Sequence, residues 1–143
     1  MVRHMIALLR LVLIAFGLTS MAIALSMGLF GPALVGDTFA TLLGLAVPVE
    51  GLANANVDSE MRFYSVYFAA FGAITVHTGW HLSTQQHLVP WLALLFFASG
   101  TARGLSWLAV GPPHPLFAIL LAIELTLPIV LIILWRATRD QSS

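Results

Sequence analysis

The sequence predicts an all-α polytopic membrane protein: a four-transmembrane-helix bundle with a short interfacial or re-entrant segment after its first helix. Of the 143 residues, 59% are hydrophobic and 8% are charged, whereas a soluble domain usually carries about 25% charged residues. Only helices and closed barrels satisfy their backbone hydrogen bonds inside a bilayer. Barrel strands alternate apolar and polar residues, but the apolar runs here are long and continuous, which favours helices.

The length of the chain predicts a single membrane domain, residues 1–143. A spanning helix takes about 20 residues, so four helices with short loops use nearly all of it and leave no room for a soluble catalytic domain. The net charge is zero without a basic run, so no nucleic acid is expected as a partner. The absence of cysteine excludes disulfides, thiolate catalysis and cysteine-ligated metals.

The first helix is expected over residues 5–30, where the apolar run is long enough to span a bilayer. A cleaved secretory signal is the alternative, because Ala22 and Ala24 fit a small-x-small cleavage site. Apolar sequence continues past that site to Phe30. We therefore expect the helix to be retained, whereas cleavage after Ala24 would leave three helices.

Gly31 and Pro32 are expected to end this helix, because proline cannot continue it. The mixed segment that follows contains an apolar patch, residues 39–47, which is too short to span a bilayer. We expect a loop with a short interfacial or re-entrant helix, lying against protein or water. Asp58 or Ser59 is the expected N-cap of the second spanning helix.

The remaining helices are expected over residues 60–80, 88–110 and 116–135. Pro90 falls in the first turn of the third helix, where proline is tolerated. The proline-rich segment 111–115 is a strong break, so the third and fourth helices should form an antiparallel hairpin.

Three glycines are predicted to bring helices close together. Gly72 lies inside the second helix, and Gly100 and Gly104 form a Gly-x-x-x-Gly pair in the third. This spacing lets helix backbones approach one another. We expect the pair to pack inside the same chain rather than to form a dimer contact.

Arginines near both ends of the sequence predict that both termini are cytoplasmic, because basic residues accumulate on the cytoplasmic side of membrane proteins. Four crossings, an even number, agree with this orientation.

Four charged residues in or beside the apolar segments predict a buried ionic cluster in the outer half of the membrane: Glu60, Arg62, Arg103 and Glu124. Each such charge costs about 2.5–3.5 kcal/mol on the insertion scale, so intramembrane charges usually turn inward and pair. Arg103 lies ten residues before Pro113 and Glu124 eleven after it, so both reach a similar depth in the hairpin. Glu60 and Arg62 are two residues apart and do not share a helix face.

Two compatible interpretations of this cluster stay open. A neutral ionic latch would fix the register of the helices, since buried polar groups can set specificity while adding little net stability. A polar pocket facing the outer side would instead receive a lipid headgroup, a small ligand or a proton, as intramembrane ionisable residues often do.

His77 and His81 are weak candidates for metal ligands. They are four residues apart and share a helix face, and imidazole suits several transition metals. A pair of histidines without a third ligand is a weak signal, so we expect interfacial histidines and no metal or other cofactor.

An ordered set of motifs resembles a known family. Its elements are Glu60-x-Arg62-Phe63-Tyr64, Gly72, Arg103-Gly104, Gly111-Pro112, Glu124 and Pro128. In order and spacing, over nearly the whole chain, they resemble the small four-helix bacterial membrane family catalogued as domain of unknown function 4345. The resemblance implies a four-helix bundle in a bacterial inner membrane and brings no established activity, substrate or cofactor. The family usually has glycine where this chain has Ser65, which bears only on local packing.

The favoured hypothesis is a non-enzymatic protein, with the lipid bilayer as its surroundings. Its outer cluster would bind a lipid, a small hydrophobic ligand or a membrane-protein partner, and a homo-oligomer is also open. The alternative is a small membrane enzyme acting on a lipid, sterol or quinone-like substrate through Glu60 and Glu124. Acid–base work needs a carboxylate of raised pKa in a ligand-sized cavity, whereas a neighbouring arginine lowers a carboxyl pKa.

Overall fold

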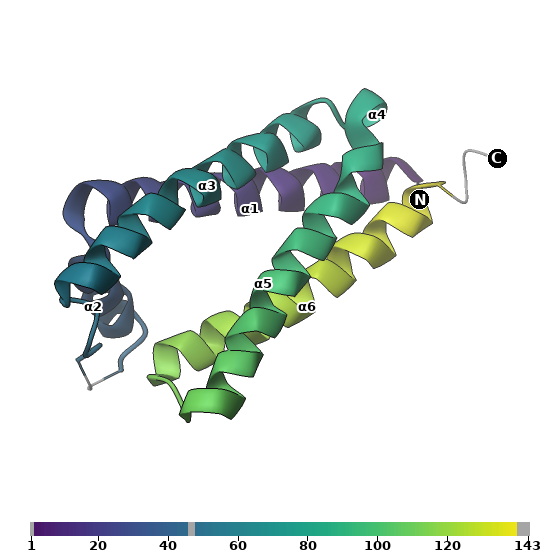
Figure 1. The fold of residues 1–143 in the computed structure, drawn as a ribbon. Coiled ribbons are helices and arrows are strands. Elements are labelled where there is room, and N and C mark those ends of the chain that lie inside the picture. The colour runs from purple at the N-terminus through teal and green to yellow at the C-terminus, as the bar shows by residue number, and fades with distance from the viewer. Residues whose placement is uncertain (1, 46–47, 140–143) are drawn as a thin grey trace.

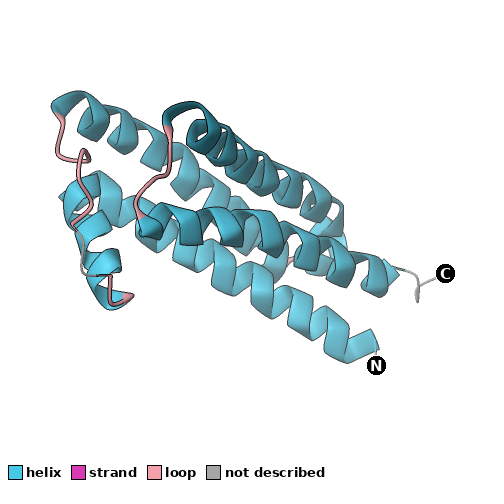
Figure 2. Cartoon of the chain, turned by 90° about the horizontal axis from the view of Figure 1, so that it is seen from below, coloured by secondary structure: helices cyan, strands magenta, loops and turns pink. Residues whose placement is uncertain are grey.

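The computed structural model describes residues 2–45 and 48–139, in which all regular structure is helical (Figure 2). In chain order the elements are α1 (Val2–Phe30), α2 (Pro32–Leu42), α3 (Ala55–Trp80), α4 (Leu82–Gln85), the 3-10 turn η1 (Gln86–Leu88), α5 (Val89–Val110) and α6 (Pro115–Arg139). The predicted all-α class is confirmed.

Within the described chain, three stretches are long and apolar enough to cross a bilayer: Arg3–Phe30, Leu82–Val110 and Pro115–Arg139. α3 has 26 residues, which is long enough. Polar residues at the start and in the last turns of α3 make it less apolar than the three stretches named above. The structure therefore supports a membrane protein, while the fourth span stays a prediction.

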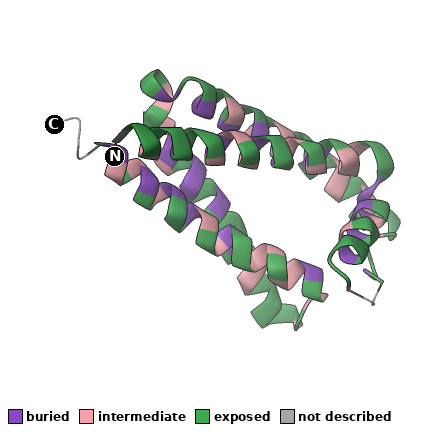
Figure 3. Ribbon diagram, turned by 180° about the vertical axis from the view of Figure 1, so that it is seen from behind, coloured by how far each residue is buried: buried purple, intermediate pink, exposed green. Residues whose placement is uncertain are grey.

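The long helices form two antiparallel pairs that diverge from one end of the molecule (Figure 1). α1 packs along α3, and α5 packs along α6. The pairs meet where α1 begins and α6 ends, and α2 lies at the other end. In the ribbon of Figure 3, the residues coloured as buried lie mainly where helices contact one another. The core at the meeting end consists of Leu9, Leu13, Leu82, Val89, Ala93, Leu131 and Leu134.

A smaller apolar cluster joins α2 to the start of α6 at the open end. It contains Ala40, Val49 and Leu116, with Phe39 and Phe117 among the partly buried residues packed against it. The segment after α1 therefore connects the two helix pairs where they are farthest apart. This gives the expected short helix a structural role.

The start of α3 corrects the sequence prediction. The helix begins at Ala55 rather than near residue 60, and the side-chain oxygen of Asn54 accepts a hydrogen bond from the backbone nitrogen of Asn56 at 3.0 Å. Asn54 has the extended backbone that an N-cap requires. Asp58 lies inside the helix and binds Arg62 instead, so the prediction of Asp58 or Ser59 as the cap is wrong.

α1 ends where expected, and α2 follows it at once. Gly31 has a φ of +87°, a left-handed conformation that favours glycine. Pro32 is the first residue of α2, where a missing backbone N–H is tolerated. The short helix thus starts earlier than the apolar patch 39–47 suggested, and residues 46 and 47 lie outside the described part. Its interfacial or re-entrant placement stays a prediction.

Helix α1 contacts α3 on both sides of Ala24, the residue after which cleavage would occur, and retention of the first helix stays a prediction. Residues on both sides of Ala24 line the contact between α1 and α3: Gly17 lies against Gly72, and Gly28 lies near Ser65. Ala24 itself is buried. Cleavage after Ala24 would remove most of the surface on which α3 packs.

Glycines set the closest helix approaches. A Cβ atom built on Gly72 would lie 2.7 Å from the backbone oxygen of Gly17, and one on Gly17 would lie 2.6 Å from the oxygen of Gly72. A Cβ atom on Gly100 would lie 2.8 Å from the Cβ atom of Glu124. Gly104 differs, because its nearest neighbour would be a Leu121 methyl carbon at 3.9 Å, an ordinary contact distance. Of the Gly-x-x-x-Gly pair, only Gly100 lies at a close contact.

Candidate functional site

Arg103 of α5 and Glu124 of α6 form an ion pair with two hydrogen bonds. Arg103 Nε donates to Glu124 Oε2 at 2.9 Å, and Nη2 donates to Oε1 at 2.7 Å. This parallel arrangement uses the planar fork of the guanidinium, which lysine lacks. The exposed fraction of the side chain is 31% for Arg103 and 10% for Glu124, so the carboxylate is buried and the guanidinium is partly accessible.

The α5–α6 hairpin brings this pair together. Gly111 ends α5 with a φ of +114°, and α6 begins at Pro115. Gly100 lies one helical turn before Arg103 and against the backbone of Glu124. Because a larger residue there would push α6 away, Gly100 helps to set the distance over which Arg103 reaches its partner.

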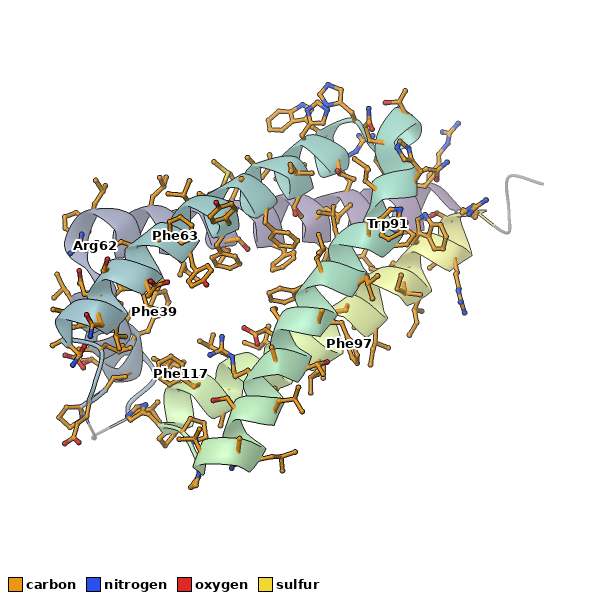
Figure 4. The ribbon with its side chains drawn as sticks, in the orientation of Figure 1. Phe39, Arg62, Phe63, Trp91, Phe97 and Phe117 are labelled. Atoms are coloured by element: carbon orange, nitrogen blue, oxygen red, sulfur yellow. The ribbon has the colours of Figure 1, made fainter. Side chains whose placement is uncertain are left out.

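Arg103 retains binding capacity after it has paired with Glu124. Its Nη1 nitrogen donates no hydrogen bond to the described part of the chain. Its Cζ atom lies 5.6 Å from the centroid of the Phe117 ring, within the range of a cation–π contact. Figure 4 shows Phe117 and Phe39 at the end of the molecule where α2 lies. Arg103 therefore has an aromatic neighbour in addition to Glu124.

Arg62 takes part in a different ionic contact. Its Nε donates to Asp58 Oδ2 at 2.7 Å, and its Nη1 donates to the backbone oxygen of Gly28 at 2.7 Å. The last carbonyl groups of a helix lack intrahelical partners, and Gly28 lies in the last turn of α1. Arg62 therefore ties the end of α1 to the start of α3.

The structure does not join the four predicted charges into one cluster. Glu60 is exposed and makes no hydrogen bond or ion pair with the described residues. Within those residues no hydrogen bond or ion pair links Arg62 to Arg103 or Glu124. Sequence reasoning missed Asp58 as the acid that binds Arg62, although their four-residue spacing on one helix face is a recognisable signal.

An aromatic cluster lies where three helices approach, and sequence reasoning did not anticipate it. Phe16 of α1 and Phe96 of α5 have ring centroids 4.6 Å apart, and Phe71 of α3 lies 6.0 Å from Phe96 in a stacked arrangement. Arg103 follows Phe96 by seven residues, or about 10 Å along the helix. Along α5, Arg103 therefore lies beyond the aromatic cluster, on the side where the pairs diverge.

Ser65, which stands where glycine was expected from the resemblance, lies in the α1–α3 contact. It is buried, and its hydroxyl donates to the backbone oxygen of Arg62 at 2.7 Å. A Cβ atom on Gly28 would lie 3.2 Å from this hydroxyl oxygen. The serine fits because the residue facing it on α1 is itself a glycine.

His77 and His81 lie together at the end of α3. Their ring centroids are 4.4 Å apart, and His81 Nδ1 lies 3.1 Å from the backbone oxygen of His77. No group of three or more potential metal-ligating side chains occurs in residues 2–45 and 48–139. The described chain thus gives this pair no third ligand.

The two predicted outer residues at the start of α3 should differ in their contribution to stability. We expect Arg62→Ala to lower the melting temperature of the detergent-purified protein, because the Gly28 carbonyl and the Asp58 carboxylate both lose a donor. Glu60→Ala is the matched control and should leave the melting temperature unchanged, since Glu60 contacts no described partner. Equal losses for the two variants would contradict the capping role of Arg62.

Comparison with curated proteins and with solved structures finds no match to this chain. A family model described as "Domain of unknown function (DUF4345)" matches residues 8–135, which include the whole of α5 and most of α6. The resemblance expected from the motifs is confirmed: the chain belongs to the DUF4345 family.

Proposed function

We propose that this chain is a non-enzymatic protein of the bacterial inner membrane that binds an amphipathic lipid or small hydrophobic ligand through Arg103. The observation that carries the proposal is the asymmetry of the ion pair. Glu124 is buried with both oxygens engaged, whereas Arg103 is partly exposed and keeps Nη1 without a partner in the described chain. An anionic or strongly polar group would be bound there.

The ion pair would have two roles in this protein. As a latch it holds α5 and α6 in register, because neither charge is stable alone in an apolar setting. As a binding site it presents a guanidinium whose orientation is fixed by Glu124 and whose face lies against Phe117. A preorganised donor loses little conformational freedom when it binds a ligand, which favours recognition over simple surface attraction.

The surroundings favour a ligand with an apolar tail. Arg103 lies between the aromatic cluster of Phe16, Phe71 and Phe96 and the apolar cluster that joins α2 to α6. A bound molecule with one polar end would therefore find Arg103 for that end and aromatic and aliphatic side chains for the rest.

The binding role can be tested by extracting the protein in native membrane discs and identifying co-purifying lipids and small molecules by mass spectrometry. The informative variant carries Arg103→Met and Glu124→Leu together, because apolar replacement of a whole ion pair is often neutral for folding. We expect a species enriched with the natural protein to fall about tenfold or more in this variant, as loss of a charge-assisted hydrogen bond implies. Glu60→Gln is the control and should retain it. No enriched species in the natural protein would refute ligand binding and favour a membrane-protein partner.

We also propose that α3 is the fourth span and that both termini are cytoplasmic. α3 runs antiparallel to α1 along its length (Figure 1), and its 26 residues extend about 39 Å, more than the roughly 30 Å of a hydrocarbon core. A reporter that is active only in the periplasm should therefore stay silent when fused after Ser143. An active reporter there would contradict the proposed topology, in which four spans leave both termini in the cytoplasm.

A further inference from the structure

A groove on the outside of the α5–α6 pair is distinct from the Arg103 site. It has a volume of about 510 Å³ and is lined by one stripe of α5, from Pro90 to Phe97, and one of α6, from Pro128 to Ile133, with Arg136 at its end. Figure 4 places Phe97 on the side of this pair that faces away from α1 and α3. The groove therefore opens towards the surroundings of the protein and not towards its core.

The groove follows from how the two helices cross. Gly100 brings α5 against Glu124, and from there the helices separate towards the start of α5 and the end of α6 (Figure 1). On the inner side the space is filled by the core around Leu131 and Leu134. On the outer side Leu94, Phe97 and Ile133 stay exposed, so an apolar channel remains between the helices.

The charge on the groove is confined to one end. Arg136 is the single charged residue among those lining it. Arg136 is exposed and makes no hydrogen bond or ion pair with any residue that the structure describes. Trp91 and Trp135 lie at the same ends of α5 and α6, and tryptophan is enriched at the level of lipid headgroups. Arg136 is thus placed where a headgroup would lie.

We propose that this groove holds one acyl chain of an anionic phospholipid, with the phosphate bound by Arg136. From Pro128 to Arg136 the chain rises eight residues, or about 12 Å, so the apolar channel extends from headgroup level well into the hydrocarbon. A guanidinium matches the geometry of a phosphate with two parallel hydrogen bonds. The volume lies within the usual range of small-molecule sites. A second copy of this chain would also cover the apolar walls of the groove. It would provide an anion for Arg136 only if one of its acidic side chains lay opposite Arg136, whereas a phospholipid brings its own phosphate.

The test measures bound lipid per chain by native mass spectrometry, with the detergent-purified full chain titrated with phosphatidylglycerol or phosphatidylcholine of identical acyl chains. We expect the natural protein to prefer phosphatidylglycerol and Arg136→Gln to reduce that preference about fivefold, the factor expected for one basic side chain at a membrane surface. Arg139→Gln is the matched control: it removes the same charge from the same helix end, outside the groove, and should keep the preference. Ile133→Trp fills the channel from an exposed position and should lower binding of both lipids.

Two results would overturn the proposal. Equal loss of preference in Arg136→Gln and Arg139→Gln would mean that general surface charge attracts the lipid. A mass of two chains that Ile133→Trp reduces to one, with lipid preference unchanged, would assign the groove to a second copy. Neither result concerns Arg103, so the failure of this inference would leave the proposed function untouched, and the reverse also holds.

Discussion

Arg103→Ala and Glu124→Gln are each expected to reduce strongly the yield of folded protein in detergent. Removing one partner of a buried ion pair typically costs about 3–5 kcal/mol, because the other charge stays buried without compensation. We expect the lower part of that range, since 31% of the Arg103 side chain is exposed. Arg103→Lys should recover only part of the loss, because an ammonium group cannot reproduce the two parallel hydrogen bonds to Glu124.

The double variant Arg103→Ala with Glu124→Gln shows how much of the loss of stability comes from the interaction between the two residues and how much from each residue alone. If the residues act as a pair, removing both costs less than the sum of the single changes, because no uncompensated charge remains. Folded yield and unfolding free energy should be measured for all four proteins at matched expression. Additive losses would show that Arg103 and Glu124 do not stabilise the fold through their interaction with each other.

Gly72→Ala and Gly100→Ala are expected to destabilise the helix bundle, whereas Gly104→Ala should not. At Gly72 the added methyl group would meet the Gly17 backbone oxygen at 2.7 Å, and at Gly100 it would meet Glu124 Cβ at 2.8 Å. Overpacking of this kind typically costs about 1–3 kcal/mol. Backbone atoms cannot move aside without separating the helices, so the cost should lie in the upper half of that range at Gly72.

The three substitutions add the same methyl group to a helical glycine. Differences in melting temperature among the three variants therefore reflect how closely a neighbouring helix approaches each position. Alanine has the higher helix propensity, by roughly 1 kcal/mol, and Gly104 has room for it beside Leu121. Gly104→Ala should therefore melt at or above the temperature of the natural protein. A similar loss at all three positions would mean that the close approach of α1 to α3 and of α5 to α6 does not depend on Gly72 and Gly100.

Features that depend on short stretches of sequence could be predicted without a structure. The scarcity of charge indicates a membrane environment, and the breaks at Gly31-Pro32 and residues 111–115 separate helices because proline removes a donor and clashes with the preceding turn. The similar depth of Arg103 and Glu124 follows from counting residues on either side of one hairpin, since each adds a fixed rise. The resemblance to the family rested on motifs of the same local kind.

Only the tertiary structure decided which faces of the helices meet. A helix that is apolar on every side has no amphipathic stripe to indicate its rotation, so the sequence could not show that Gly104 points away from a close contact or that Gly17 faces Gly72. For the same reason the sequence could not predict the aromatic cluster, whose rings come from three helices. Arg62 could not be assigned to the end of α1 either, because Gly28 precedes it by 34 residues and their meeting depends on how α1 and α3 pack.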